Sequence, residues 1–222
     1  MARLKRPTNE TSSPITQYLN WKSNDKAFAY YDKAKGENVL VELPIKILFL
    51  EHYHTVKGWN DASESGIFSN EVYSIGSEPL TVKAFKGGEI ATGVYKEIKE
   101  SIKNAGAVYN RSIYAMTSEG KLINISLKGS GVKAYSDFYN DNNHLLDNSW
   151  IEINSAKEGK KGAVKYTTPE FTLGSPISKE ENKMADEVAN SLQTYMDSYF
   201  GRDDQEATVE ATVEVSAEDM PF

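Results

Sequence analysis

The sequence predicts a mainly β protein, a β-barrel with added helices, followed by a C-terminal helix and a disordered acidic tail. Between residues 27 and 174, short runs of β-branched and aromatic residues alternate with Gly, Asn, Asp and Lys. Such runs are typical of antiparallel strands joined by turns, as in a barrel or a sandwich. Helical periodicity interrupts this pattern in its middle and follows it near the C-terminus.

The expected strands are short, rich in β-branched and aromatic residues, and bounded by turn residues. They cover residues 28–32, 37–43, 45–56, 66–75, 80–85, 107–116, 121–127, 149–154 and 163–168. The turn residues at 117–121 and 157–162 favour hairpins between the strands that flank them.

Three helices are expected. Apolar residues at every fourth position predict one over 94–105, with Thr92 as its cap and Gly106 as its end. A shorter helix fits residues 131–141. The longest is predicted over 178–200, because Ser178 and Glu181 form a capping box. Its apolar stripe consists of Met184, Val188, Leu192, Met196 and Tyr199.

This order of elements is that of an elaborated OB-fold, a five-stranded Greek-key barrel with a helix between its third and fourth strands. The five strands would be residues 39–57, 66–77, 80–86, 107–116 and 121–128, with the helix at 94–105. The strand at 28–32 and the hairpin of 149–154 and 163–168 would be additions to the barrel. The domain so defined covers residues 27–201.

Charge distinguishes the two ends of the chain from this domain. Residues 1–26 begin with Arg3, Lys5 and Arg6 and are interpreted as a mobile basic arm. The net charge of the 222-residue chain is −7, yet three basic and twelve acidic residues follow residue 174, which leaves 22 basic and 20 acidic residues before it. Residues 202–222 are acidic and poor in apolar residues, so a flexible tail is predicted. An edge strand over 208–215 is the alternative.

Composition also restricts the compartment. The chain has no cysteine, which excludes disulfides and thiolate metal sites and favours a reducing compartment. No apolar stretch approaches the ~20 residues of a membrane helix, and the N-terminus lacks the apolar segment of a secretory signal. We therefore expect a soluble, cytoplasmic protein that does not contact membranes.

Aromatic residues that stand next to basic ones point to nucleic acid. Single strands are held by a basic groove and by exposed rings on which bases stack, each stack being worth ~1–3 kcal/mol. The alternative is that these rings belong to the core, since half of the side chains on a strand point inward. The candidate contacts with single-stranded DNA are Trp21, Tyr53, Lys57, Trp59, Tyr109, Arg111, Tyr114, Lys157, Lys160, Lys161, Lys165 and Tyr166.

Other chemistry has little support in the sequence. His52 and His54 share one face of an expected strand and could ligate a metal, but no third ligand is evident. The glycines at 87–88 and 129–131 lack the context of a phosphate-binding loop, and no nucleophile-elbow spacing occurs. We expect no enzymatic activity, no cofactor and no metal.

The last five residues carry a resemblance. Glu218, Asp219, Met220, Pro221 and Phe222 resemble the tip of bacterial single-stranded DNA-binding proteins, which ends in acidic residues, an aliphatic residue, Pro and Phe. In that family the tip docks replication and repair enzymes. The resemblance implies that the Phe ring enters an apolar pocket of a partner, while a basic rim receives the carboxylates.

The body is larger than in the bacterial proteins and is more similar to OB-fold single-stranded DNA-binding proteins of bacteriophages and mobile elements. This resemblance implies sequence-nonspecific binding and protection of single-stranded DNA in DNA replication, recombination and repair. The tip would recruit replication or recombination proteins, in the cytoplasm of a bacterial host if the chain is phage-encoded. Two alternatives stay open: a phage virion or assembly protein that binds no nucleic acid, and a metal-dependent single-strand nuclease.

Overall fold

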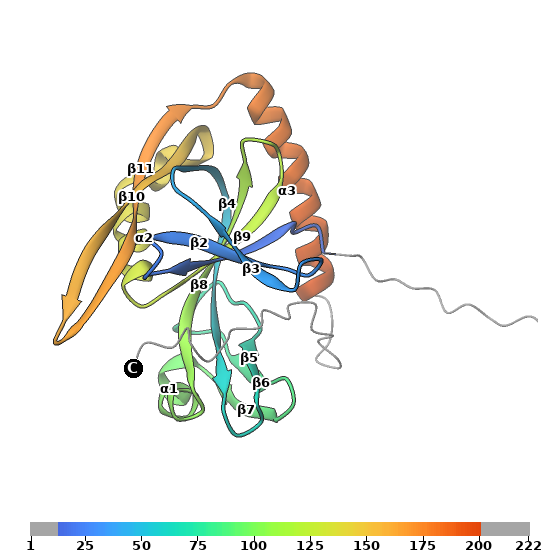
Figure 1. The fold of residues 1–222 in the computed structure, drawn as a ribbon. Coiled ribbons are helices and arrows are strands. Elements are labelled where there is room, and N and C mark those ends of the chain that lie inside the picture. Colours follow the sequence, from blue (N-terminus) through green and yellow to red (C-terminus); the bar gives the residue numbers. More distant parts are fainter. Residues whose placement is uncertain (1–12, 201–222) are drawn as a thin grey trace, which may run out of the picture.

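The computed structural model describes residues 13–200, with side chains up to residue 198. Within this range the chain is mainly β, as the sequence predicts: eleven strands form one hydrogen-bonded sheet, and three α-helices accompany it (Figure 1). No helix in this range is long and apolar enough to cross a membrane.

The strands are β1 (Gln17–Lys22), β2 (Ala27–Asp32), β3 (Glu37–Val41), β4 (Ile45–Asn60), β5 (Ser65–Ser69), β6 (Leu80–Ala84), β7 (Gly88–Gly93), β8 (Ala107–Thr117), β9 (Leu122–Lys128), β10 (Ser149–Lys161) and β11 (Val164–Pro176). The helices are α1 (Tyr95–Asn104), α2 (Ser130–Asn142), the 3-10 helix η1 (Asn143–Asn148) and α3 (Lys179–Phe200).

The sixteen-residue strand β4 organises the sheet. The strand order is β3-β2-β1-β9-β8-β4-β5-β6-β7, and β4 also pairs with β10, which in turn pairs with β11. Figure 1 shows β4 and β8 extending from the upper body into a lower lobe that holds α1 and β5 to β7. The long strand therefore connects two separately packed parts.

Alternation along β4 sends its apolar residues to both faces of the upper sheet. Ile47 and Phe49 pack in the cluster that contains Tyr135 of α2. Leu48 packs in a different cluster with Ala185 of α3. The two helices thus cover opposite faces of the sheet, and Figure 1 shows them on opposite sides of it.

The lower lobe has its own core. Val56 of β4, Ile67 of β5 and Val82 of β6 pack with Ile98 and Ile102 of α1 in one cluster of buried residues. The four-residue repeat that predicts α1 therefore marks the face that seals this lobe.

The helix predictions are confirmed in type and nearly in extent. At α3 the amide of Glu181 donates to Ser178 Oγ at 3.1 Å, and the amide of Ser178 donates to Glu181 Oε2 at 2.6 Å, so the capping box is present. At α1 the N-cap is Val94 rather than Thr92, and it makes no side-chain capping bond. The prediction of Thr92 is wrong because residues 88–93 continue as β7.

The strand predictions need several corrections. β10 and β11 extend to residues 161 and 176, beyond the expected 154 and 168, so residues 157–161, expected as a turn, are strand. β1 lies inside the stretch interpreted as a mobile arm, and β7 was assigned to no strand. The expected strand 39–57 is interrupted at 42–44, while the one at 66–77 stops at residue 69. β1 and β7 are short and carry few apolar residues, so pairing with β9 and β6, rather than local sequence, establishes them.

The hydrogen-bonded sheet is open. The five expected barrel strands follow the order β9-β8-β4-β5-β6, and among residues 13–200 no pairing joins β6 to β9, so closure into a five-stranded barrel is not part of the described topology. β1 runs parallel to β9, whereas antiparallel strands alone were expected.

The close approach of residue 106, just before β8, to the backbone of β4 requires a glycine. Gly106 has φ +93°, and a methyl group there would overlap the carbonyl oxygen of Trp59. We therefore expect Gly106→Ala to lower the free energy of unfolding by about 2 kcal/mol or more, from strain and overlap together. Urea denaturation measures this loss. Gly66→Ala is the matched control, because a Cβ at Gly66 would meet nothing within 4 Å; equal loss in both variants would contradict the explanation.

Candidate nucleic-acid interface

Two of the predicted stacking residues are buried. Tyr53 is 2% exposed and Tyr114 is 4% exposed, and both pack with Leu192 and Met196 of α3. The Tyr114 hydroxyl donates to Glu71 Oε2 at 2.7 Å. These positions correct the prediction that both rings are available to bases, because α3 covers the face to which they point.

Trp21, also predicted to stack on bases, makes contacts within the protein. Its indole Nε1 donates to the carbonyl oxygen of Thr167 in β11 at 2.9 Å, and its ring meets Phe28 edge-on at 5.0 Å between centroids. Trp21 therefore ties the first hairpin of the sheet to β11, at the step where Thr167 pairs with Glu158.

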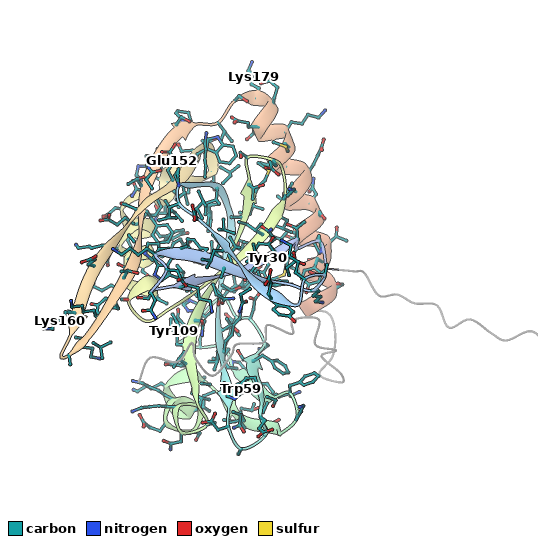
Figure 2. The ribbon with its side chains drawn as sticks, in the orientation of Figure 1. Tyr30, Trp59, Tyr109, Glu152, Lys160 and Lys179 are labelled. Atoms are coloured by element: carbon teal, nitrogen blue, oxygen red, sulfur yellow. The ribbon has the colours of Figure 1, made fainter. Side chains whose placement is uncertain are left out.

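Lys57 and Trp59 lie on β4 in the lower lobe, and both are partly buried. Burial lowers the pKa of the Lys57 ammonium group, and the charge of Glu71 opposes that shift. Figure 2 places Trp59 in the lower lobe, far from the labelled Lys160 of the hairpin. Lys57 and Trp59 are thus separated from the candidate lysines of the β10–β11 hairpin.

The β10–β11 hairpin is clamped at Thr167, which pairs with Glu158, and the last residues of the two strands project beyond this point. The amide of Thr167 donates to Ser23 Oγ at 2.6 Å, and the Thr167 hydroxyl donates to the Ser23 carbonyl at 2.7 Å. Beyond this clamp the two strands project as a ribbon, with Lys160 near its tip (Figure 2). Lys26 contacts Glu158 at 2.7 Å, but both side chains are largely exposed, so this pair adds little stability.

Residues 157–165, which lie beside the clamp and beyond it, form the most cationic stretch of the described chain. Lys157, Lys160, Lys161 and Lys165 are all exposed, and one acidic residue, Glu158, lies among them. The register sets Lys160 directly opposite Lys165. Like charges opposite each other destabilise a strand pair, so a polyanion would stabilise this arrangement.

An aromatic ring lies between two of these lysines. Tyr166 pairs with Gly159, and a Cβ at Gly159 would overlap the Tyr166 ring, so the ring covers the glycine. Because side chains alternate, Lys157 and Lys161 flank Gly159 on the same face of β10. One face of the ribbon therefore presents lysine, tyrosine and lysine in succession.

Arg111 is the second notable cation. It is the single arginine among residues 13–200, it is partly buried, and within that range no carboxylate forms an ion pair with it. Its Nε has no hydrogen-bond partner in the described part of the chain, and its Nη1 donates to His54 Nε2 at 3.0 Å. A partly buried guanidinium without a counter-ion is unfavourable, so this group is suited to an anionic ligand.

The Arg111 contact fixes the protonation of its neighbours. A guanidinium can only donate, so Nε2 of His54 is the acceptor and its Nδ1 carries the proton. Nδ1 lies 2.7 Å from the Tyr109 hydroxyl and donates to it. The hydroxyl proton of Tyr109 is therefore directed elsewhere, and the phenol can donate to a ligand.

Two groups of aromatic contacts lie between the β10–β11 hairpin and α1, and the neighbouring residues His52 and His54 of β4 belong one to each group. Phe171 of β11 meets Tyr135 of α2, whose ring meets Tyr139 and His52; His54 meets Tyr109, whose ring meets Tyr95 of α1. We call this set the ring row, and it comprises Phe171, Tyr135, Tyr139, His52, His54, Tyr109 and Tyr95. It lies on the α2 face of the upper sheet and continues to the edge of the lower lobe.

Sequence reasoning found part of this row and missed the rest. The sequence pattern identifies Tyr109 of this row, and Arg111 beside it, as candidates for DNA contacts, but not Tyr95, Tyr135 or Tyr139. The aromatic residues 135, 138 and 139 recur at helical spacing in α2 and were the available signal. His52 and His54 were considered as metal ligands, whereas their ring nitrogens contact tyrosine hydroxyls and Arg111.

Neither a metal site among the described residues nor a similarity to known proteins indicates the function of this surface. Residues 13–200 contain no group of three or more His, Asp or Glu side chains placed to hold a metal ion. The chain matches no protein-family model, and no curated protein or solved structure is significantly similar to it. The tip formed by Glu218, Asp219, Met220, Pro221 and Phe222 lies outside the described residues, as do residues 1–12 of the predicted arm and the whole tail.

His52 and His54 make the stability of the folded protein depend on pH. Burial, followed by the charge of Arg111, lowers the pKa of both His52 and His54 to about 4; Glu78 opposes the shift at His54. The unfolded chain, with histidine pKa values near 6.5, binds more protons than the folded chain between these limits. The stability contributed by the two neutral rings is therefore lost as pH falls from about 6.5 to about 4.

Urea denaturation at pH 7.0, 5.5 and 4.5 tests this linkage. We expect His54→Gln to reduce the pH dependence, because glutamine can accept from Arg111 and donate to Tyr109 without titrating. An unchanged dependence in His54→Gln would show that His54 does not supply it.

Proposed function

We propose that this protein binds single-stranded DNA without sequence preference, through the lysine-rich hairpin and the ring row with Arg111. The lysines and Arg111 would neutralise phosphates, while Tyr166, Tyr109 and Tyr139 would offer faces to bases. Backbone phosphates and base faces occur in every sequence, so these contacts carry no sequence preference.

The observation that carries this proposal is the projecting hairpin. Four exposed lysines with a tyrosine between two of them, and Lys160 opposite Lys165, are unfavourable without a partner of opposite charge. A flexible polyanion with aromatic bases satisfies both features. A rigid protein partner would need acidic and apolar groups at matching positions, which is a more restrictive requirement.

The tail adds a second role to this proposal. We infer from the resemblance of the last five residues that they recruit replication or recombination proteins, while the body binds DNA. The OB-fold belongs to the same proposal. Its support is that β4, β5, β6, α1, β8 and β9 occur in the order that this fold requires, with β7 as an additional strand between β6 and α1.

Fluorescence anisotropy of labelled oligo(dT) tests the function. We expect saturable binding of the full chain at low salt, weaker binding as salt rises, and little preference between dT and mixed sequences. Removing residues 218–222 should leave this affinity unchanged or increased, since it removes negative charge. A flat titration at low salt would favour a virion or assembly role, and magnesium-dependent loss of the labelled strand would favour a nuclease.

A further inference from the structure

The lower lobe has a second surface that α1 does not cover. Val56, Ile67 and Val82 point into the cluster beneath α1. Because side chains alternate, their neighbours along the same strands point to the opposite, outer side of the sheet. The register aligns three of these neighbours in one row, with Lys57 opposite Phe68 and Phe68 opposite Lys83.

The next row of this surface consists of two aromatic residues with a glycine between them. Trp59 pairs with Gly66, and the amide of Phe85 donates to the Gly66 carbonyl at 3.0 Å from the other side. Apart from its chain neighbours, a Cβ at Gly66 would meet no heavy atom of residues 13–200 within 4 Å. Trp59 is partly buried and Phe85 is 54% exposed, so an open space lies above Gly66 with an aromatic residue on each side. We call this space the Gly66 slot.

The dimensions of the slot suit one flat ring. Neighbouring strands lie about 4.8 Å apart, so the backbones of Trp59 and Phe85, on either side of β5, are about 9.6 Å apart. One base between two stacked rings needs about 7 Å between the outer rings, at the usual stacking distance of about 3.4 Å. Within the described residues neither Trp59 nor Phe85 contacts another aromatic ring, so both remain available for stacking.

The residues around the Gly66 slot also suit a flat aromatic ring that is attached to a phosphate. Phe68 provides an apolar floor in the adjacent row, and Lys83 lies next to it with its positive charge. A packing defect in the core would be enclosed by other side chains. The Gly66 slot instead is bordered by the exposed Phe85 and lies near Lys83. An isolated glycine inside a strand is also the residue that permits close approach of a ligand to the backbone.

We propose that the Gly66 slot receives one unpaired nucleobase, held between Trp59 and Phe85. This inference rests on the proposed binding of single-stranded DNA, and it adds a base-binding position on the surface opposite the α1-sealed core. The contact depends on the base and not on the phosphate, so it should vanish for a strand that lacks bases.

Gly66→Val tests the slot, because valine fills the open space and suits a strand. We expect oligo(dT) affinity to fall between about 5- and 100-fold, the range for one lost base stack. The quenching of Trp59 fluorescence by oligo(dT) should disappear in Gly66→Val, and Trp59→Phe identifies that part of the signal. Gly76→Val is the matched control, since Gly76 is also open but lies in an exposed turn.

The outcomes separate the slot from the proposed function. If the wild-type chain binds oligo(dT) and Gly66→Val binds it with unchanged affinity and quenching, the slot is wrong and the function stands. If the wild-type chain does not bind, the function fails and the slot with it. An abasic strand should bind without quenching Trp59, and quenching by that strand would also contradict the slot. Phe85→Ala provides a second variant should circular dichroism show that Gly66→Val is unfolded; full retention of affinity and quenching in Phe85→Ala would overturn the inference.

Discussion

Replacing the four hairpin lysines, Lys157, Lys160, Lys161 and Lys165, by glutamine should reduce oligo(dT) affinity by about two to three orders of magnitude near 0.1 M salt. Each phosphate contact on a single strand contributes about 0.7 to the slope of log affinity against log salt. Four lost contacts should therefore also reduce this slope by up to about 3. Anisotropy titrations at several salt concentrations measure both quantities.

The fold should tolerate this change, because all four side chains are exposed and none of them forms an ion pair in the described chain. The matched comparison uses two pairs of lysines. Lys160→Gln with Lys165→Gln should weaken binding, whereas Lys179→Gln with Lys183→Gln, on the exposed face of α3, should leave it nearly unchanged. Similar losses in both pairs would mean that only net charge matters and that the hairpin is not a specific contact.

Arg111→Met should weaken oligo(dT) binding by about 10- to 100-fold, the usual effect of one hydrogen bond to a charged group. Methionine keeps most of the length of the side chain and its apolar contacts but cannot bind a phosphate. The fold should lose little stability, since Arg111 has no carboxylate partner among residues 13–200.

The same variant has a readout that does not require DNA. Because the charge of Arg111 contributes to the low pKa of His52 and His54, removing it should raise the pKa of both rings above about 4. Nuclear magnetic resonance titration of the imidazole protons measures this shift. Raised histidine pKa values with undiminished DNA binding would confirm the geometry and remove Arg111 from the interface; Lys183→Met serves as the control for loss of one positive charge.

Local sequence was sufficient for the helices. The capping box at Ser178 and the four-residue repeat of α1 depend on residues close in the chain, and both appear in the structure. The strand β1 was not predicted because its partner β9 lies far along the chain. The strand β7 pairs with the neighbouring β6, but Ile90 and Ala91 are its only apolar residues, so it lacks an alternating pattern. Local propensity cannot report such pairing.

Which rings are exposed could not be read from the sequence. Tyr53 and Tyr109 both lie on strands next to charged or polar residues, yet α3 covers the first and leaves the second partly exposed. The outcome depends on which face a distant helix covers, and that helix begins more than sixty residues later. The hairpin lysines are exposed, although residues 157–161, expected as a turn, belong to β10; their role as DNA contacts stays a prediction.

Lysine acetylation in the presence and absence of saturating oligo(dT) tests most directly whether the hairpin contacts DNA. We expect Lys157, Lys160, Lys161 and Lys165 to be protected by the strand, while Lys179 and Lys183 of α3 react at the same rate in both samples. Hairpin lysines that react equally fast with and without bound DNA would contradict the proposed interface.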